Sequence, residues 1–461
     1  MTGYRLPGTI IEDVTKTTSY TSLSTQRIPC FIGVASPYKT VKYEAVVRSS
    51  TGLADSLVYS SAGIYTITAV GAQRGLSNYI EGVHWNLIAD QIVWTSSGIV
   101  AAGATYYVSY KYVRPFDPDN LTDSELNDYR YKEFTQFDEV VADLGEDIPD
   151  HPLVMICKLA LRYYGLPKIA VVQVYADSTT YYEMALELIK YRSVHDICLL
   201  NSSSTVRALG VNHVQVCSLP DNGRYRMLWT GAPVGTPIGD ETDLTSISGM
   251  IAGIRFERVV FVNATRAKYY YIDPITNTEQ YTVVDGAFIA AAVAAYRDSF
   301  TYPATTLLNK VIGGLTLFTE DYDDYYSEYM LTQAGAASAF VMTNSAGGMK
   351  VLDDLTTDNT TVERNNINII TAKDYIMFDV IFQMNSQFRG TVVTNRESYS
   401  STIRAFLSSL FAGYRRNGII EAVDQIRVTL PSDRRDTVYI YFSYYAVYTH
   451  KYTEGELAIV I

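Results

Sequence analysis

The stretch KIAVVQVYADSTTYYEMALELIKYRSVHDICLLN, residues 168–201, decides the fold class that we expect for this chain. Residues 168–176 form a short apolar run typical of a buried strand, and residues 181–192 follow with the pattern of a helix. Residues 195–201 again have the pattern of a strand. A strand, a helix and a second strand in succession indicate an α/β layer architecture, in which helices cover a sheet.

The same alternation continues on both sides of this stretch. Residues 137–145 and 152–165 have helical patterns, and an alanine-rich helix is expected at residues 285–298. Further strands are expected at residues 224–232 and 258–264. We therefore predict an α/β core domain over residues 117–330.

The residues that precede this core domain have a different pattern. In residues 41–116, short strand-like runs are separated by turns that contain Gly, Ser and Asp, so we predict an inserted β-rich outer domain. Residues 1–20 are expected to form an N-terminal extended arm. Residues 21–40 are expected to hold the first core strand, in the apolar run that begins at Pro29.

After the core domain the pattern becomes mixed, and we predict an α+β domain over residues 331–436. Residues 362–371 have the pattern of a strand. One helix is expected to begin at an Asp374 cap. A second helix is expected to begin at Ser400 or Ser401 and to close at 417–418, which are Asn and Gly.

The last segment, residues 437–461, is expected to be a C-terminal β arm. It is rich in aromatic and β-branched side chains and closes on a fully apolar run that nothing protects as a sheet edge: Leu457, Ala458, Ile459, Val460 and Ile461. This run is either buried in its own domain or paired with a neighbouring chain. The predicted fold class is thus α/β and α+β multidomain, with a central α/β layered core, an inserted all-β domain, and a C-terminal α+β domain with extended N- and C-terminal β arms.

The amino-acid composition limits the kinds of molecule that this chain is expected to bind. The net charge of −12 argues against nucleic acid and anionic membranes as main partners, and the 39 tyrosines suit strands and protein interfaces. We expect no signal peptide and no membrane span. The cysteines, Cys30, Cys157, Cys198 and Cys217, form no CxxC pair, so we expect reduced thiols, with an intersubunit disulfide from Cys30 as the alternative.

No motif for catalysis or for a cofactor is present. The sequence contains no phosphate-binding glycine loop, no HExxH and no GxSxG, and its five histidines lie far apart. Residues 117–125 resemble a calcium loop only loosely, and the acidic residues 319–329 are expected to form a solvated loop. His195 and Asp196 are expected to point to opposite faces of a strand. We therefore predict no catalytic, cofactor-binding or metal site, and no enzyme.

Several stretches together resemble one family, the contractile tail sheath proteins of bacteriophages and related contraction machines. The resemblance follows the order of the chain, through residues 6–13 (LPGTIIED), 31–36 (FIGVAS), 284–306, 331–357, 367–390 and 402–420. It is strongest over residues 284–461. No single motif carries it; the order and spacing of the stretches do.

The resemblance implies a structural role. Subunits would form stacked hexameric rings around a tail tube and contract to drive the tube through the host envelope. The N-terminal arm, with Thr9, Ile10, Ile11 and Val14, and the C-terminal run 457–461 would add strands to sheets of neighbouring subunits. The helix with Arg404, Arg415 and Arg416 would face the tube, unless these arginines pair with acidic residues of their own subunit.

The partners implied are further copies of the chain, the tail tube protein, and baseplate and tail terminator proteins, without cofactor, direct nucleic-acid contact or membrane insertion. The implied location is the virion, assembled in the host cytoplasm. Two alternatives stay open. One is another self-assembling phage tail or baseplate structural protein, and the other is an enzyme that uses the acidic loop at residues 320–328. An enzyme should form a small discrete oligomer, whereas a sheath subunit should be monomeric or form long tubes.

Overall fold

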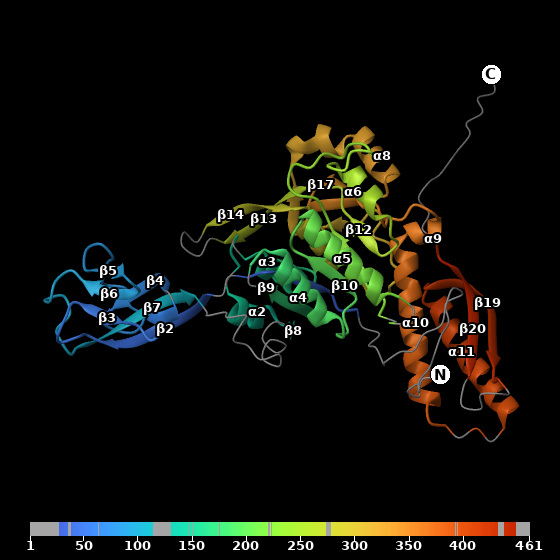
Figure 1. Cartoon of the computed structure of the whole chain (residues 1–461), viewed down its shortest axis with the longest axis horizontal. Coiled ribbons are helices and arrows are strands. Elements are labelled where there is room, and N and C mark those ends of the chain that lie inside the picture. Colours follow the sequence, from blue (N-terminus) through green and yellow to red (C-terminus); the bar gives the residue numbers. More distant parts are fainter. Residues whose placement is uncertain are drawn as a thin grey trace.

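The computed structural model describes residues 27–431 and 438–448, apart from 36–37, 63, 114–130, 146, 150, 175, 220–221, 223, 273–277, 392 and 394. Both predicted strand-donating segments, residues 9–14 and 457–461, therefore lie outside the described residues, as does the calcium-like stretch 117–125. The described part has a central body flanked by a small all-β module at one end and by two long helices with a two-stranded sheet at the other (Figure 1).

The central body is built on a six-stranded sheet whose order is β12-β11-β10-β1-β9-β8. All neighbouring strands are parallel except β8, which runs antiparallel to β9 at one edge. Taken in chain order, the five parallel strands have the 2-1-3-4-5 arrangement of a doubly wound sheet. The strands are β1 (Cys30–Val34), β8 (Tyr131–Phe134), β9 (Ile169–Val174), β10 (Asp196–Leu199), β11 (Met227–Thr230) and β12 (Val259–Phe261).

Helices cover both faces of this sheet, because alternate strand residues point to opposite sides. Cys30 and Ile32 pack in one apolar cluster with α4 (Thr179–Ile189) and α5 (Ser204–Cys217). Phe31, between them, packs in the other cluster, with α2 (Phe137–Leu144), α3 (Pro152–Lys158) and α7 (Gly286–Asp298). A single π-helical turn, Leu159–Tyr163, extends α3. The predicted α/β layer architecture is confirmed.

Helix α7 lies in the middle of the core. All of its residues except Tyr296 are buried, and its alanines let it approach β10 and β11 closely. The approach is close at Gly286, where a Cβ atom would lie 2.7 Å from the backbone nitrogen and oxygen of Ala232. Glycine at this position is therefore what allows the helix to start against the end of β11.

Two small antiparallel sheets and several short helices complete the central body. One sheet has the order β14-β13-β16 and the other β15-β18-β17. Their members are β13 (Arg266–Ile272), β14 (Glu279–Asp285), β15 (Val311–Ile312), β16 (Leu315–Leu317), β17 (Val341–Ser345) and β18 (Gly348–Asp353). The helices are α6 (Ile247–Ile254), a 3₁₀ turn (Thr319–Asp321), a π-helical turn (Tyr322–Tyr326) and α8 (Glu328–Ala336).

The all-β module consists of two three-stranded antiparallel sheets, β2-β7-β4 and β3-β6-β5. A buried carboxylate, Asp55, organises its core by accepting hydrogen bonds from Trp94 Nε1 and the Tyr106 hydroxyl, both at 2.8 Å. The strands are β2 (Tyr38–Val47), β3 (Ala54–Ser56), β4 (Ile64–Gly71), β5 (Trp85–Ile88), β6 (Gln91–Trp94) and β7 (Thr105–Val113), with a 3₁₀ turn at Ser60–Ala62. Apart from the first three residues of β2, these strands lie within residues 41–116, the segment for which a β-rich domain was predicted.

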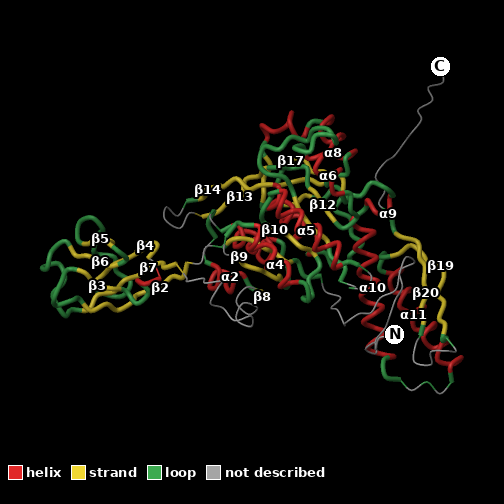
Figure 2. Tube along the Cα trace, viewed as in Figure 1, coloured by secondary structure: helices red, strands yellow, loops and turns green. Residues whose placement is uncertain are grey.

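The C-terminal part has its own apolar cluster, in which α10 and α11 pack against a two-stranded sheet (Figure 2). Its elements are α9 (Val362–Asn365), α10 (Ile367–Phe388), α11 (Arg396–Arg416), β19 (Ile420–Thr429) and β20 (Tyr439–Ala446). The cluster includes α10 residues from Ala372 onward, whereas Ile367 and Ile370 still pack in the central core. Helix α10 thus joins the two cores. The boundary at residue 331 stays a prediction.

Three local predictions in this part are wrong. Residues 362–365 and 367–371 are helical, because Thr361 caps α9 and Ile367 and Ile370, which suggested a strand, are buried residues of α10. Asp374 is an interior residue of α10, which begins seven residues earlier at Ile367. Helix α11 begins at Arg396, where the Asn395 side chain accepts from Ser398 N, rather than at Ser400 or Ser401. Its predicted end at residues 417–418 is confirmed.

Candidate assembly surfaces and the junction that positions them

The sheet formed by β19 and β20 is the first candidate assembly surface. These strands pair only with each other among the described residues, so each leaves its outer edge unpaired. One face of the sheet is covered, since Phe442 contacts Phe411 of α11 with ring centroids 4.9 Å apart. The other face exposes Tyr439, Tyr441 and Tyr445. A covered sheet with open edges can accept strands from other chains by main-chain hydrogen bonding.

The exposed face of α11 is the second candidate surface. The helix buries Ile403, Leu407, Phe411 and Tyr414, and it turns its small side chains and its arginines outward. Arg404 and Arg415 lie eleven residues apart, about three turns, and therefore on one stripe of the helix. Arg404, Arg415 and Arg416 are all exposed, and none forms an ion pair with an acidic residue in the described part of the chain. The alternative that they pair within their own subunit finds no support there.

A buried ionic network joins the sheet to α10. Asp374 of α10 accepts two hydrogen bonds from Arg258, at 2.7 and 2.8 Å, and lies 3.2 Å from His195 Nε2. On its other side, His195 Nδ1 lies 3.1 Å from Asp196 Oδ2 at the start of β10. Asp374 thus ties α10 to residues of the central body.

The network continues from Asp196 to the first described residue of the chain. Asp196 accepts from Trp229 Nε1 at 2.6 Å and pairs with Arg27 at 2.7 Å. Arg27 also lies 2.7 Å from Asp298, at the end of α7. Arg27, which follows the predicted N-terminal arm at residues 1–20 by seven residues, is thus held by a buried ion pair with Asp196.

The charges of the network follow from burial and from the neighbouring groups. Burial alone would raise the pKa of Asp374, but Arg258 and His195 outweigh it and hold that pKa well below its usual range. Burial likewise favours the neutral form of Asp196, yet Arg27 and His195 lower its pKa well below the ordinary value. Burial and the adjacent Asp196 carboxylate raise the pKa of Asp298 well above its usual range, against the influence of Arg27. The surroundings therefore favour the ionised form of Asp374 and Asp196 and the protonated form of Asp298.

His195 was predicted to point away from Asp196, and this is wrong. The residue lies just before β10 rather than on it, so the alternation of a strand does not apply and its ring reaches the neighbouring carboxylate. Burial alone would lower the pKa of His195, but Asp196 and Asp374 outweigh burial and the repulsion of Arg27, and the pKa is raised above 6.5. In its protonated form the ring donates a hydrogen bond to each of the two carboxylates.

A pH dependence follows from this raised pKa. The stabilisation that His195 gives is complete below pH 6.5, the unfolded-state value, and is lost as pH rises through the higher folded-state pKa. We expect the difference in unfolding free energy between the parent chain and His195→Gln to be larger at about pH 6 than at about pH 9. Denaturant titrations at the two pH values measure it. A difference that stays constant or grows with pH contradicts the assignment.

The described residues give little support to catalysis by the acidic residues, to a metal site or to a disulfide. The prediction of a solvated acidic loop at residues 319–329 is wrong, because these residues form a 3₁₀ turn, a π-helical turn and the start of α8. Asp321 is buried there and pairs with Arg266, while Glu320, Asp323 and Asp324 are exposed. No group of three or more His, Cys, Asp or Glu side chains that could hold a metal occurs among the described residues. All four cysteines are buried and unpaired, so a disulfide from Cys30 to a neighbour has no surface thiol to use. In the described part no helix is both long and apolar enough to cross a membrane.

Comparison with known proteins gives two kinds of match. A family model described as a domain of unknown function, DUF4815, matches residues 14–130, which include the all-β module. No curated protein sequence matches the chain. Among solved structures, the helical sheath of the anti-feeding prophage in its contracted state has 11% sequence identity and a TM-score of 0.53, over 99% of both chains.

Two further structures match at similar levels. A chain of the anti-feeding prophage baseplate, six-fold symmetrised, has 13% identity and a TM-score of 0.50 over 100% of both chains. The sheath complex of PVC, an extracellular contractile injection system, in its contracted state has 12% identity and a TM-score of 0.51, over 74% of this chain and 89% of that one. At such identities the similarity concerns the fold. Over nearly its whole length, this chain has the fold of the contractile sheath proteins.

Proposed function

We propose that this chain is the structural subunit of a contractile sheath, and that it is not an enzyme. The observation that carries the proposal is the match, over 99% of both chains, to a sheath protein in a helical assembly. The open-edged β19–β20 sheet gives that fold a physical means of assembly. A baseplate component is the second candidate, because a chain of similar fold occurs in a baseplate structure.

The proposed mechanism of assembly is strand exchange. Residues 9–14 and 457–461 of one subunit add strands to the open edges of β19 and β20 on neighbouring subunits. The apolar run Leu457, Ala458, Ile459, Val460 and Ile461 is then covered by its acceptor, which answers why nothing in its own sequence protects it. Main-chain hydrogen bonds hold the lattice together, while the arms act as hinges when the subunits move as nearly rigid bodies.

The proposed lattice consists of stacked hexameric rings around a tail tube, in a phage virion assembled in the host cytoplasm. Contraction drives the tube through the host envelope, with energy that is stored in the lattice at assembly, so the subunit needs no nucleotide. Baseplate and tail terminator proteins are the proposed partners at the two ends. The all-β module and α11 lie at opposite ends of the described chain, which suits an outer domain and a tube-facing helix (Figure 1).

The tube contact is assigned to the exposed stripe of α11. Arg404, Arg415 and Arg416 form a local positive patch in a chain of net charge −12 and complement an acidic tube surface. Contacts of this kind are individually weak, typically about 0.2–1 kcal/mol, and sensitive to salt. Weak contacts suit a sheath–tube interface that has to break during contraction.

Reversing this charge tests the contact. We expect Arg415→Glu combined with Arg416→Glu to lose sheath from purified tail tubes while the subunit stays folded, because both side chains are exposed and unpaired in the described structure. Co-sedimentation with tubes measures binding, and circular dichroism checks folding. The matched control, Lys42→Glu with Arg74→Glu, makes the same charge change in the all-β module and should bind as the parent does. Equal binding by both double variants contradicts the assignment of α11.

A further inference from the structure

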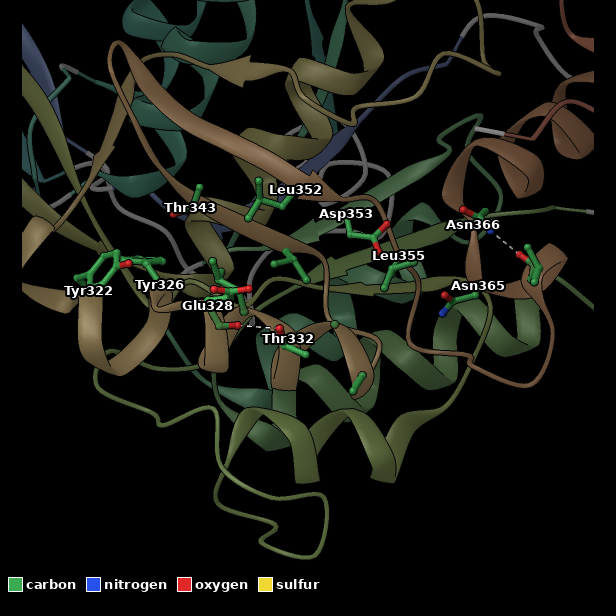
Figure 3. Close-up of a pocket in the computed structure, with 15 residues that line it drawn as sticks. Tyr322, Tyr326, Glu328, Thr332, Thr343, Leu352, Asp353, Leu355, Asn365 and Asn366 are labelled. Atoms are coloured by element: carbon green, nitrogen blue, oxygen red, sulfur yellow. Dashed lines mark hydrogen bonds between the residues drawn. The ribbon is translucent and has the colours of Figure 1, made fainter. Parts of the chain in front are cut away.

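An open groove of about 870 Å³ lies between α8 and the strands β17 and β18. Figure 3 shows Glu328 and Thr332 of α8 on one side and Thr343 and Leu352 of the strands on the other. Tyr322 and Tyr326 lie at one end of the groove, and Asn365 and Asn366, at α9, lie at the other. Its apolar lining consists of Leu331, Val341, Leu352, Leu355 and Val362.

The lining favours an apolar occupant. Covering its apolar side chains would remove apolar surface from water, which is favourable. An extended apolar peptide therefore suits the groove.

The described C-terminal end of the chain lies at the α9 end of this groove. Asn368 Nδ2 donates to the carbonyl of Val447 at 3.5 Å, and the Tyr448 hydroxyl donates to Glu363 of α9 at 3.0 Å. Helix α9 also supplies Val362 and Asn365 to the groove lining. Leu457 follows nine residues after Tyr448, a length that spans up to about 30 Å when extended. The apolar run is thus tethered within reach of the groove.

We propose that in the free subunit residues 457–461 occupy this groove of their own chain, and that they leave it to pair with a neighbour on assembly. The inference rests on the proposed function, in which the same residues are the donated strand. An exposed apolar strand invites uncontrolled pairing, so a subunit that carries one needs a resting place for it. The groove covers the strand in the free subunit and delays assembly until the sheet edge of a neighbouring subunit is available.

The affinity required is modest because the segment is tethered. A short flexible tether gives an effective concentration on the order of 1 mM, so an intrinsic dissociation constant of about 0.1 mM keeps the groove occupied about ten times as long as empty. An open sheet edge on a neighbour, which offers a row of main-chain hydrogen bonds, can outcompete so weak a contact.

The test compares amide hydrogen exchange in monomer fractions of the full chain and of a chain that ends at Gly455. We expect exchange in α8 and β17 to be about tenfold faster in the shorter chain, and a synthetic peptide of residues 449–461 to restore the protection. Val362→Lys, at an exposed position of the rim, should accelerate exchange in the full chain. Val58→Lys, at an exposed position of the all-β module, is the matched control and should not.

The outcomes separate this inference from the proposed function. Equal exchange in the full and shortened chains, or no protection by the added peptide, overturns the resting place in the groove, whether or not tubes form. If protection is seen, Val362→Lys should also assemble faster than the parent, since its arm is already released. Assembly of the shortened chain into long tubes overturns the donated strand instead.

Discussion

Replacing Asp374 with alanine is expected to lower the free energy of unfolding by about 3–5 kcal/mol, because it removes one partner of a buried ion pair and leaves the other uncompensated. The two partners left behind are Arg258, which donates two hydrogen bonds to this carboxylate, and His195. Both are buried. Since Asp374 ties α10 to this network, its loss should also loosen the packing of α10 against the central body.

Denaturant titration of the monomer measures the loss, and Asp374→Asn separates charge from shape. The amide keeps the size of the side chain but not its charge, so it should also destabilise the chain strongly. Asp323→Ala, at an exposed position within the acidic residues 319–329, is the control and should change stability by no more than about 0.5 kcal/mol. If Asp374→Ala unfolds like the control, the network does not hold α10 in place.

Ending the chain at Gly455 is expected to abolish long assemblies while leaving the subunit folded. The lost strand would have made a few main-chain hydrogen bonds, each contributing about 0.5–1.5 kcal/mol, and would have buried apolar side chains that each contribute about 1.5–3 kcal/mol. Each lattice contact should therefore weaken by several kcal/mol, which is a factor of at least about a thousand. Sedimentation velocity on the two chains measures the change.

A single substitution distinguishes strand pairing from simple apolar contact. Val460→Pro keeps the segment apolar but removes a main-chain donor, so it should impair assembly nearly as much as truncation. Val460→Ile keeps the donor and is the matched control, which should assemble like the parent. Normal assembly by the proline variant would mean that the segment does not add as a strand.

The α/β core could be predicted because its signals are local. Buried parallel strands such as β9 are continuous apolar runs, and α7 is marked by its alanines. The exposed arginine stripe of α11 also follows from helical spacing, with Ile403 and Leu407 marking the buried side. These features need no knowledge of which distant residues meet.

The ionic network could not be predicted, because it depends on contacts between residues that lie far apart in the sequence. The local sequence around Asp374 is that of a helix cap. Its true partner, Arg258, lies 116 residues away, and nothing in the local pattern identifies it. The ring of His195 reaches Asp196 only because β10 begins one residue later than the apolar pattern suggested. The groove beside α8 is formed by segments that each have an ordinary local pattern, so only their packing creates it.

Electron microscopy of the purified full-length chain, under conditions that promote assembly, tests the central claim most directly. The account predicts hollow tubes of helically stacked six-membered rings, wide enough to enclose a tail tube. Small, closed oligomers of uniform size under the same conditions would contradict a sheath subunit.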